Sequence, residues 1–205
     1  FEQDCALLEA EGVALLFAPR PEEMYPPGAT TFVNVEGIGD RLDGASRPGH
    51  FRGVATIVAK LFHVVAPDKA FFGQKDAAQV AVLRRMVRDL NFDLELIACP
   101  IVRDPDGLAL SSRNRYLSAR ERLQALVLSR ALHAMSATYH AGQEHVTPLL
   151  DAGHSVMAIE PEVRIDYLEI VDPDTLLPLA EATPGALVAI AAHVGSTRLI
   201  DNTIL

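Results

Sequence analysis

The sequence contains few cysteines, and they lie far apart. Among 205 residues only Cys5 and Cys99 occur, and neither belongs to a CxxC pair or to a Cys/His spacing typical of a metal site. Small disulfide frameworks and zinc modules both need such pairs. The sequence therefore excludes both classes, and a reducing, cytoplasmic setting is expected.

Long apolar runs and an excess of positive charge are also absent. No apolar stretch approaches the roughly 20 residues of a membrane helix, and the N-terminus lacks the basic and then apolar order of a secretion signal. Lysine and arginine number 18 against 27 aspartate and glutamate, a net charge of −9. Neither a membrane nor a nucleic acid is expected as a partner, and any anion site must be built locally.

The composition is otherwise that of a globular protein. Hydrophobic residues make up 49% of the chain and charged residues 22%, so a core of ordinary size can form. The length corresponds to one large domain or two small ones.

The first part of the chain predicts a helix and two strands. The helix covers residues 4–11 and ends at Gly12, and the apolar run Val13–Phe17 follows as a buried strand. After a proline-rich connection, Thr31–Val35 alternates like a half-exposed strand. A polar loop then extends over Gly37–Gly49.

Residues 54–99 predict alternating helices and strands. Apolar residues recur at helical spacing from Val54 to Pro67, and a second helix is predicted from a capping box at Asp76 and Gln79 through Leu90. Short strands are expected at 69–72 and 94–99. This alternation predicts a parallel α/β sheet of Rossmann-like layer order.

The character of the sequence changes after Pro100. A polar loop precedes a capping box at Ser118 and Glu121 that opens a long helix toward Gly142, and Thr147 followed by Pro148 predicts another helix start. Strands are expected at 163–171 and 187–192. We therefore predict two domains, a Rossmann-like one over residues 1–101 and a smaller α+β domain over residues 102–205.

Three segments are candidates for binding an anion. In the first, Gly73-Gln74-Lys75-Asp76, a strand meets a helix N-terminus whose free N–H groups attract phosphate, and Lys75 adds a charge. Gln79, on the same helical face, could bind a substrate hydroxyl or carboxylate. The alternative is that Asp76 and Gln79 merely cap the helix and that Lys75 is solvated.

The second candidate is the loop over residues 104–115, which carries Ser111, Ser112, Arg113 and Arg115 beside Gly107. Hydroxyls and guanidiniums suit the charge that develops on a triphosphate under attack. An ordinary polar linker is the alternative reading.

The third candidate is Arg47-Pro48-Gly49-His50-Phe51-Arg52-Gly53, which brings basic side chains to a helix start and could equally be a solvated loop. The remaining histidines form no metal-ligand pattern, and no metal ligands are assigned to the chain.

Together these segments resemble the pantoate–beta-alanine ligase family. The resemblance rests on His50-Phe51-Arg52-Gly53-Val54-Ala55-Thr56, on Phe72-Gly73-Gln74-Lys75-Asp76 with Gln79, and on residues 107–117, GLALSSRNRYL, and it extends over the whole chain in one register. It implies an α/β nucleotidyltransferase fold and a cytoplasmic homodimer. It also implies ATP-dependent condensation of (R)-pantoate with beta-alanine through a pantoyl adenylate, with Mg²⁺ and with release of AMP and pyrophosphate.

The resemblance also implies a role for individual residues. ATP would be bound by Gly73, Gln74, Lys75, Asp76, Val102, Leu110, Ser111, Ser112 and Arg113. Of these, Lys75, Ser111, Ser112 and Arg113 would be catalytic and would stabilise the leaving pyrophosphate. Pantoate would contact Gln79 and an apolar surface of Phe72, Val54, Ile57 and Val58, with Arg47 and His50 nearby.

One family feature is absent from the sequence. Members of the family carry an HxGH-type signature near their start, and no HxGH occurs in these 205 residues. The predicted Rossmann-like sheet is therefore expected to be incomplete at its start. Two other functions stay open: a related nucleotidylyltransferase, and a non-catalytic fragment that binds ATP without turning it over.

Overall fold

The computed structural model describes all 205 residues in two compact units, Phe1–Phe32 and Val33–Leu205. The first unit contains helices α1 (Glu2–Ala10) and α2 (Pro21–Met24). Gly12 follows α1 with a φ of +75°, and its N–H donates to the Glu9 carbonyl at 3.0 Å. This confirms the predicted helix and its glycine stop.

The two strands predicted in the first part of the chain are wrong. Val13–Phe17 forms no strand, because no other segment pairs with its backbone, and Leu15 is 80% exposed. Thr31–Val35 is not a strand either. The N–H of Val33 donates to the Thr56 hydroxyl oxygen at 2.9 Å instead of to a neighbouring strand.

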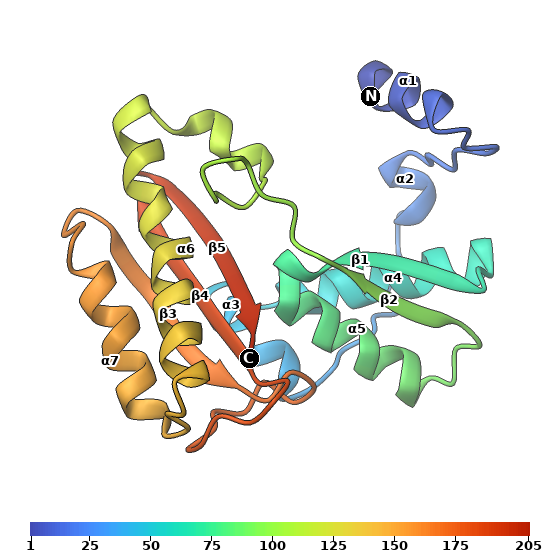
Figure 1. The fold of residues 1–205 in the computed structure, drawn as a ribbon. Coiled ribbons are helices and arrows are strands. Elements are labelled where there is room, and N and C mark those ends of the chain that lie inside the picture. The colour runs from blue at the N-terminus through green and yellow to red at the C-terminus, as the bar shows by residue number, and fades with distance from the viewer. The chain divides into compact units, whose positions relative to one another are not determined.

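A parallel pair of strands with two helices forms the first half of the larger unit. The order along the chain is α4 (His50–Val65), β1 (Lys69–Gly73), α5 (Ala77–Asp89) and β2 (Glu95–Cys99). The strands run side by side in register from Lys69–Glu95 to Gly73–Cys99 (Figure 1). The predicted helix–strand alternation and the parallel pairing are confirmed.

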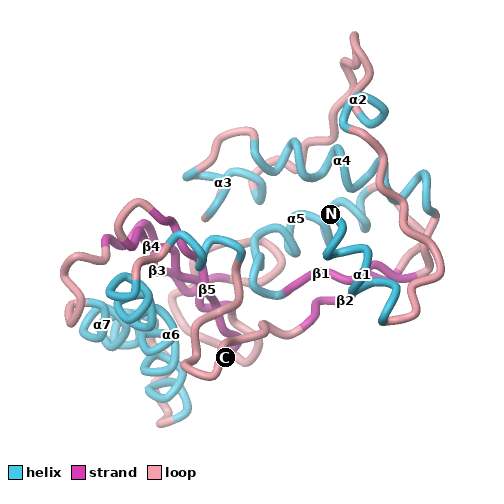
Figure 2. The backbone as a smooth tube through the Cα atoms, turned by 90° about the horizontal axis from the view of Figure 1, so that it is seen from above, coloured by secondary structure: helices cyan, strands magenta, loops and turns pink.

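Helix α5 packs against α4 and against both strands (Figure 2). Several of the apolar positions that predicted these helices become buried, including Phe62 of α4 and Leu83 of α5, whereas Val65 and Leu90 at the helix ends are exposed. The polar segment before α4 contains a 3-10 turn, η1 (Ile38–Asp40), and the single-turn helix α3 (Asp43–Ser46).

Two helices and an antiparallel sheet form the second half. They are α6 (Ala119–His140), α7 (Val146–Met157), β3 (Arg164–Val171), β4 (Leu187–Val194) and β5 (Thr197–Ile204), with the sheet order β3-β4-β5. The capping box of α6 is confirmed, because Ser118 and Glu121 bond each other's backbone N–H groups. Apolar side chains of α6 and α7 pack on the sheet and form one core cluster.

Two details of this half differ from the prediction. His145 precedes α7 as its N-cap, so Thr147 does not cap the helix and Pro148 lies inside the first turn, where its missing N–H has no consequence. Strand β5 was not predicted, because the buried polar residues Asp201 and Asn202 interrupt its apolar pattern.

The second apolar cluster joins both halves of the chain. It contains α4 and α5 side chains together with Val171, Leu176, Leu187 and Ala189. The domain boundary between residues 101 and 102 stays a prediction. None of the helices is both long and apolar enough to span a membrane.

Candidate active site

The predicted phosphate-binding turn lies where β1 ends. Gly73 is the last residue of β1 and pairs with Cys99, the last residue of β2. A 3-10 turn, η2 (Gln74–Asp76), leads directly into the N-terminus of α5. Ligands of parallel α/β sheets bind beyond the carboxyl ends of the strands, so the turn occupies the expected position for one.

The predicted capping role of Asp76 is wrong. Asp76 is the N-cap residue of α5, but its side chain makes no capping hydrogen bond. The 3-10 turn runs straight into the helix, and Asp76 lines a small pocket together with Gln79. Both residues therefore border the candidate site.

This pocket collects residues from all three predicted segments. Its volume is about 30 Å³, and its lining comes from α3, α4, η2, α5, β5 and the 3-10 helix η3 (Ser112–Tyr116). The five predicted residues that meet in it are Arg47, His50, Asp76, Gln79 and Arg113. The remaining lining residues are Asp43, Phe51, Arg198 and Ile200.

Arg47 and His50 are in direct contact at this pocket. Arg47 Nη1 lies 2.9 Å from His50 Nε2, and because a guanidinium has only donors, Nε2 must accept and the ring proton must be on Nδ1. Burial, and then the charge of Arg47, lower the pKa of His50 below 6.5, although Asp43 opposes the shift. His50 is therefore neutral at pH 7.

Lys75 meets the second predicted segment in an adjoining small pocket. Lys75 and Ser111 line it together with Asn114, and Ile200 belongs to the lining of both pockets. The hydroxyl oxygen of Ser111 caps η3 by accepting the N–H of Arg113 at 3.2 Å. The Asn114 amide nitrogen donates to the Ala109 carbonyl at 3.0 Å, whereas its buried oxygen has no partner.

The loop before η3 folds back on itself as a narrow hairpin. The Leu110 N–H donates to the Val102 carbonyl at 2.9 Å, and Arg103 and Ala109 form an antiparallel bridge. Val102 is 65% exposed and Leu110 is 48% exposed. These two residues and the exposed Ser112 line neither small pocket.

The apolar residues expected around pantoate lie at the edge of the core. Val58 is buried, and Val54, Ile57 and Phe72 are partly buried against the same cluster. Gln74 lines neither of the two pockets, and its amide donates to Asn202 Oδ1 at 3.2 Å. None of these five residues lines the pocket that contains Arg47, His50, Asp76, Gln79 and Arg113.

Sequence reasoning missed an ionic cluster beside the pocket. Arg198 of β5 contacts Asp43 at 2.7 Å and Asp166 at 2.8 Å, and Ser46 donates to Asp166 at 2.8 Å. Burial opposes the ionisation of Asp166, but the hydrogen bonds from Ser46 and Arg198 outweigh it and lower the pKa of Asp166. Burial also raises the pKa of Tyr167, which bonds Asp43. No local pattern links these residues, since 155 positions separate Asp43 from Arg198.

Among the charged side chains of the two pockets that form no ion pair, Lys75, Arg47 and Arg113 are positive and only Asp76 is negative. Arg198 is neutralised by its two carboxylates, whereas Lys75, Arg47 and Arg113 form no ion pair. No group of three or more His, Cys, Asp or Glu side chains could hold a metal ion. The arrangement suits an anionic ligand recognised by separate basic side chains.

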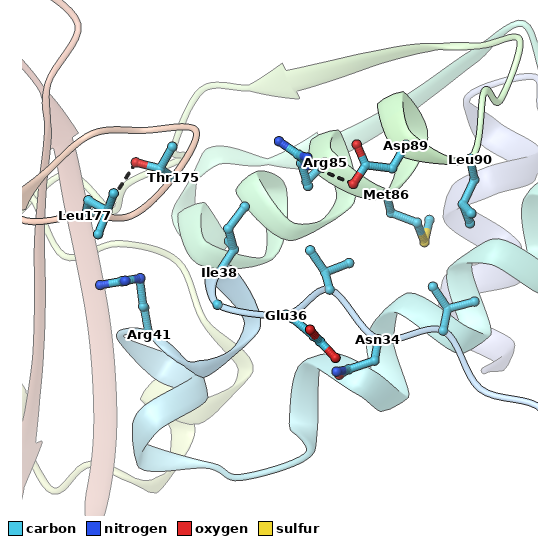
Figure 3. A pocket seen from close by; sticks show the side chains of 13 residues that line it. Asn34, Glu36, Ile38, Arg41, Arg85, Met86, Asp89, Leu90, Thr175 and Leu177 are labelled. Atoms are coloured by element: carbon cyan, nitrogen blue, oxygen red, sulfur yellow. Dashed lines mark hydrogen bonds and ion pairs between the residues drawn. The ribbon is translucent and has the colours of Figure 1, made fainter.

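A larger hollow of about 570 Å³ lies elsewhere in the same unit, between the segment Val33–Ile38 and the end of α5 (Figure 3). In it Arg85 donates to Asp89 at 2.7 Å, so this arginine is already paired. None of the predicted site residues lines this hollow.

Comparison with known proteins identifies relatives of the whole chain. The pantothenate synthetase of Acidobacterium capsulatum is 67% identical over 204 residues, covering 100% of this chain and 68% of its own. That of Koribacter versatilis is 60% identical, covering 100% of this chain and 70% of its own.

Solved structures agree with this relationship. The crystal structure of pantothenate synthetase from Thermus thermophilus matches with a TM-score of 0.95 at 53% identity, covering 98% of this chain and 73% of that one. A pantoate-beta-alanine ligase from Francisella tularensis, complexed with beta-gamma ATP and beta-alanine, matches with a TM-score of 0.75 at 28% identity, covering 99% and 69%. The predicted α/β nucleotidyltransferase-like class is confirmed.

The sequence profile of the pantoate-beta-alanine ligases matches residues 1–204. The resemblance inferred from the three motifs is thereby confirmed, and the chain belongs to the pantoate–beta-alanine ligase family.

Proposed function

We propose that the protein joins (R)-pantoate to beta-alanine at the expense of ATP. A carboxylate oxygen of pantoate attacks the α-phosphorus of ATP, and the bond to the β-phosphate oxygen breaks, which releases pyrophosphate. The amine of beta-alanine then attacks the acyl carbon of pantoyl adenylate, loses its proton, and expels AMP. Both steps depend on orientation and charge stabilisation rather than on an enzyme nucleophile.

The observation that carries this proposal is the group of three unpaired cations at the two adjoining pockets. Lys75, Arg47 and Arg113 have no carboxylate partner in a chain whose net charge is −9. Cations that have no carboxylate partner and lie next to a helix N-terminus favour a polyphosphate. They also stabilise the negative charge that accumulates on pyrophosphate as it leaves.

Two segments would bind different parts of the ATP molecule. Gly73, Gln74, Lys75 and Asp76 would hold the phosphates and the ribose, and Val102 would contact the adenine through its backbone. Leu110, Ser111, Ser112 and Arg113 would form the second ATP segment, with Ser111 held in place as the cap of η3. Because Leu110 and Ser112 are exposed, a ligand can reach them without rearrangement of the core.

Gln79 would bind pantoate through its amide, because it lines the pocket together with Arg47 and Arg113. Val54, Ile57, Val58 and Phe72 would face the dimethyl end of pantoate, since three of the four are only partly buried. Arg47 and the neutral His50 would complete the anion site from the start of α4.

Magnesium would enter with ATP as the ion bound to its phosphates. Such an ion is held mainly by substrate phosphates and one or two carboxylates, so it needs no protein cage; Asp76 is a carboxylate of the pocket. We further propose that β1 and β2 belong to a Rossmann-type sheet and that the protein works in the cytoplasm as a homodimer.

The experiment that tests the function is the exchange of labelled pyrophosphate into ATP, with Mg²⁺ and without beta-alanine. Exchange that requires pantoate supports the ligase. Exchange without pantoate would instead indicate a nucleotidylyltransferase, and ATP binding with no exchange would indicate a non-catalytic protein. A variant at the other end of β1, Lys69→Ala, serves as the control for Lys75→Ala, because Lys69 is exposed and pairs only with Glu95.

A further inference from the structure

Strand β5 contains a buried amide that the proposed mechanism does not use. Asn202 is 2% exposed, and burial of an amide costs free energy unless its donors and acceptor are paired. Asn202 precedes the last residues of the chain by only a few positions, yet its partners lie on the turn between β1 and α5, 128 and 127 positions earlier.

The hydrogen bonds of Asn202 are directed at the backbone of that turn. Its Nδ2 donates to the carbonyl of Gln74 at 2.9 Å and to the carbonyl of Lys75 at 3.0 Å. Its Oδ1 accepts from Gln74 Nε2 at 3.2 Å. Two carbonyl acceptors on one side and one donor on the other fix the orientation of the amide. The side chain thus uses both of its N–H donors to hold two consecutive peptide groups.

The neighbouring residue of β5 holds the other predicted ATP segment. Asp201 forms two hydrogen bonds with Arg103, and Arg103 also donates to the Gly107 carbonyl at 3.0 Å. The Asn202 N–H donates to the Asp201 carboxylate at 2.8 Å, which links the two networks. Consecutive residues of one strand therefore fix both segments that would contact ATP.

We infer that Asn202 is a positioning residue for the adenylation step, acting through Lys75. This inference rests on the proposed function. Asn202 lies on the buried side of the turn and holds the main chain from which the Lys75 side chain extends. A lysine side chain has many rotamers, so a fixed backbone limits where its charge can lie. Misplacement of a catalytic group by about 1 Å can cost on the order of 100-fold in rate.

The two half-reactions separate this role from a general structural one. Lys75 would act on the triphosphate, which has left as pyrophosphate before beta-alanine attacks. An Asn202 variant should therefore be impaired in pantoate-dependent pyrophosphate exchange, but not in the reaction of chemically prepared pantoyl adenylate with beta-alanine. The ratio of the two rates does not depend on how much of the variant is folded, so it stays informative for an unstable variant.

The test uses Asn202→Asp, which keeps the shape but replaces two donors by a carboxylate facing two carbonyl oxygens, and the milder Asn202→Ser. We expect kcat for exchange to fall about 100-fold in Asn202→Asp, less in Asn202→Ser, with the second half-reaction nearly unchanged. The exposed Asn34 gives the matched control, because Asn34→Asp makes the same chemical change away from both pockets.

A second measurement asks whether Asn202 acts through Lys75. In a Lys75→Ala background, Asn202→Asp should cause little further loss of exchange, since coupled residues are not additive. Three results would each overturn the inference. They are an equal fall in the rates of both half-reactions of Asn202→Asp, an undiminished fall in the exchange rate when Asn202→Asp is added to Lys75→Ala, and an unchanged exchange rate in Asn202→Asp alone. If the unmodified protein shows no pantoate-dependent exchange, the proposed function itself fails and the inference fails with it.

Discussion

Arg103 and Asp201 form an ion pair through two parallel hydrogen bonds, although 98 positions separate them. Nη1 lies 2.7 Å from Oδ2 and Nη2 lies 2.9 Å from Oδ1. The aspartate side chain is 4% exposed, whereas that of the arginine is 31% exposed. The pair connects the hairpin before η3 to strand β5. The position of the second predicted ATP segment, residues 110–113, therefore depends on strand β5.

Removal of the arginine should destabilise the fold. Arg103→Ala leaves a buried carboxylate without its cation, and we expect the free energy of unfolding to drop by about 3 kcal/mol. This value is at the lower end of the range for broken buried ion pairs, because Arg103 is partly exposed. Urea unfolding measures the change. The exposed Arg130 provides the control, since Arg130→Ala should shift stability by less than about 0.5 kcal/mol. Equal midpoints for the two variants would contradict the prediction.

Lys75→Ala should abolish most adenylation while leaving the fold intact. The lysine forms no ion pair and is not part of either core cluster, and removal of one group that stabilises the transition state typically costs 100- to 1000-fold in rate, roughly. Pyrophosphate exchange measures the loss, and circular dichroism checks the fold. Full activity, or unfolding, would show that the assigned role is wrong. Lys69→Ala should retain exchange.

Gln79→Leu should weaken pantoate binding specifically. Gln79 lines the pocket, and leucine has a similar size but cannot form the hydrogen bonds of the amide. Loss of one such bond corresponds to about 1 kcal/mol, so KM for pantoate should rise roughly fivefold or more with KM for ATP unchanged. A parallel rise of both KM values in steady-state assays would argue against a contact with pantoate alone.

The neutral state of His50 predicts a pH dependence of stability. Burial and the charge of Arg47 lower the pKa of His50 below 6.5 in the folded protein, so the unfolded chain binds the proton more readily. This contribution is fully present above about pH 6.5 and is lost as the pH falls through the folded pKa. His50→Gln removes the titration.

Chemical denaturation of both proteins from about pH 7.5 to about pH 5, a range that brackets the ordinary histidine pKa, tests this effect. The stability of the original protein relative to His50→Gln should decline toward acid pH. A difference between the two that is constant over the whole range would show that His50 does not titrate with folding.

Replacement of glycine by alanine should have opposite effects on stability at Gly44 and at Gly53. A Cβ at Gly44 would overlap the carbonyl oxygen of Gly39 and lie 3.1 Å from a Phe51 ring atom, whereas a Cβ at Gly53 would meet nothing within 4 Å. Gly44→Ala should therefore destabilise the protein by about 1–3 kcal/mol. Gly53→Ala should stabilise it by roughly 0.5–1 kcal/mol, because it improves helix propensity in α4. Thermal unfolding compares the two, and a stabilised Gly44→Ala would contradict the close packing of α3.

Local sequence patterns predicted the elements whose partners are nearby. The apolar stripe of α4, the capping box at Ser118 and the short strands β1 and β2 follow from helical or strand periodicity and from caps within a few residues. The predicted strand at Val13–Phe17 failed for the complementary reason. Its apolar residues indicate burial, but a strand exists only where another segment supplies hydrogen bonds.

The candidate site, too, was predicted from the sequence only in part. Its three segments and the family followed from the motifs around Arg47, Lys75 and Arg113, because glycine, basic and hydroxyl residues at loop positions indicate anion binding by themselves. Tertiary structure alone decided which side chains meet. Arg198 pairs with Asp43 across 155 positions, and Asn202 reaches the Lys75 turn across 127.

The sequence by itself therefore determined the chemistry available to this protein and most of its helices and strands, since both depend on residues close together along the chain. The tertiary structure decided the geometry, because strand β5 brings Arg198, Asp201 and Asn202 to loops that precede it by about half the chain or more. The periodicity of β5 is broken by the buried polar side chains that hold those loops, so the residues that organise the site are also those that concealed the strand.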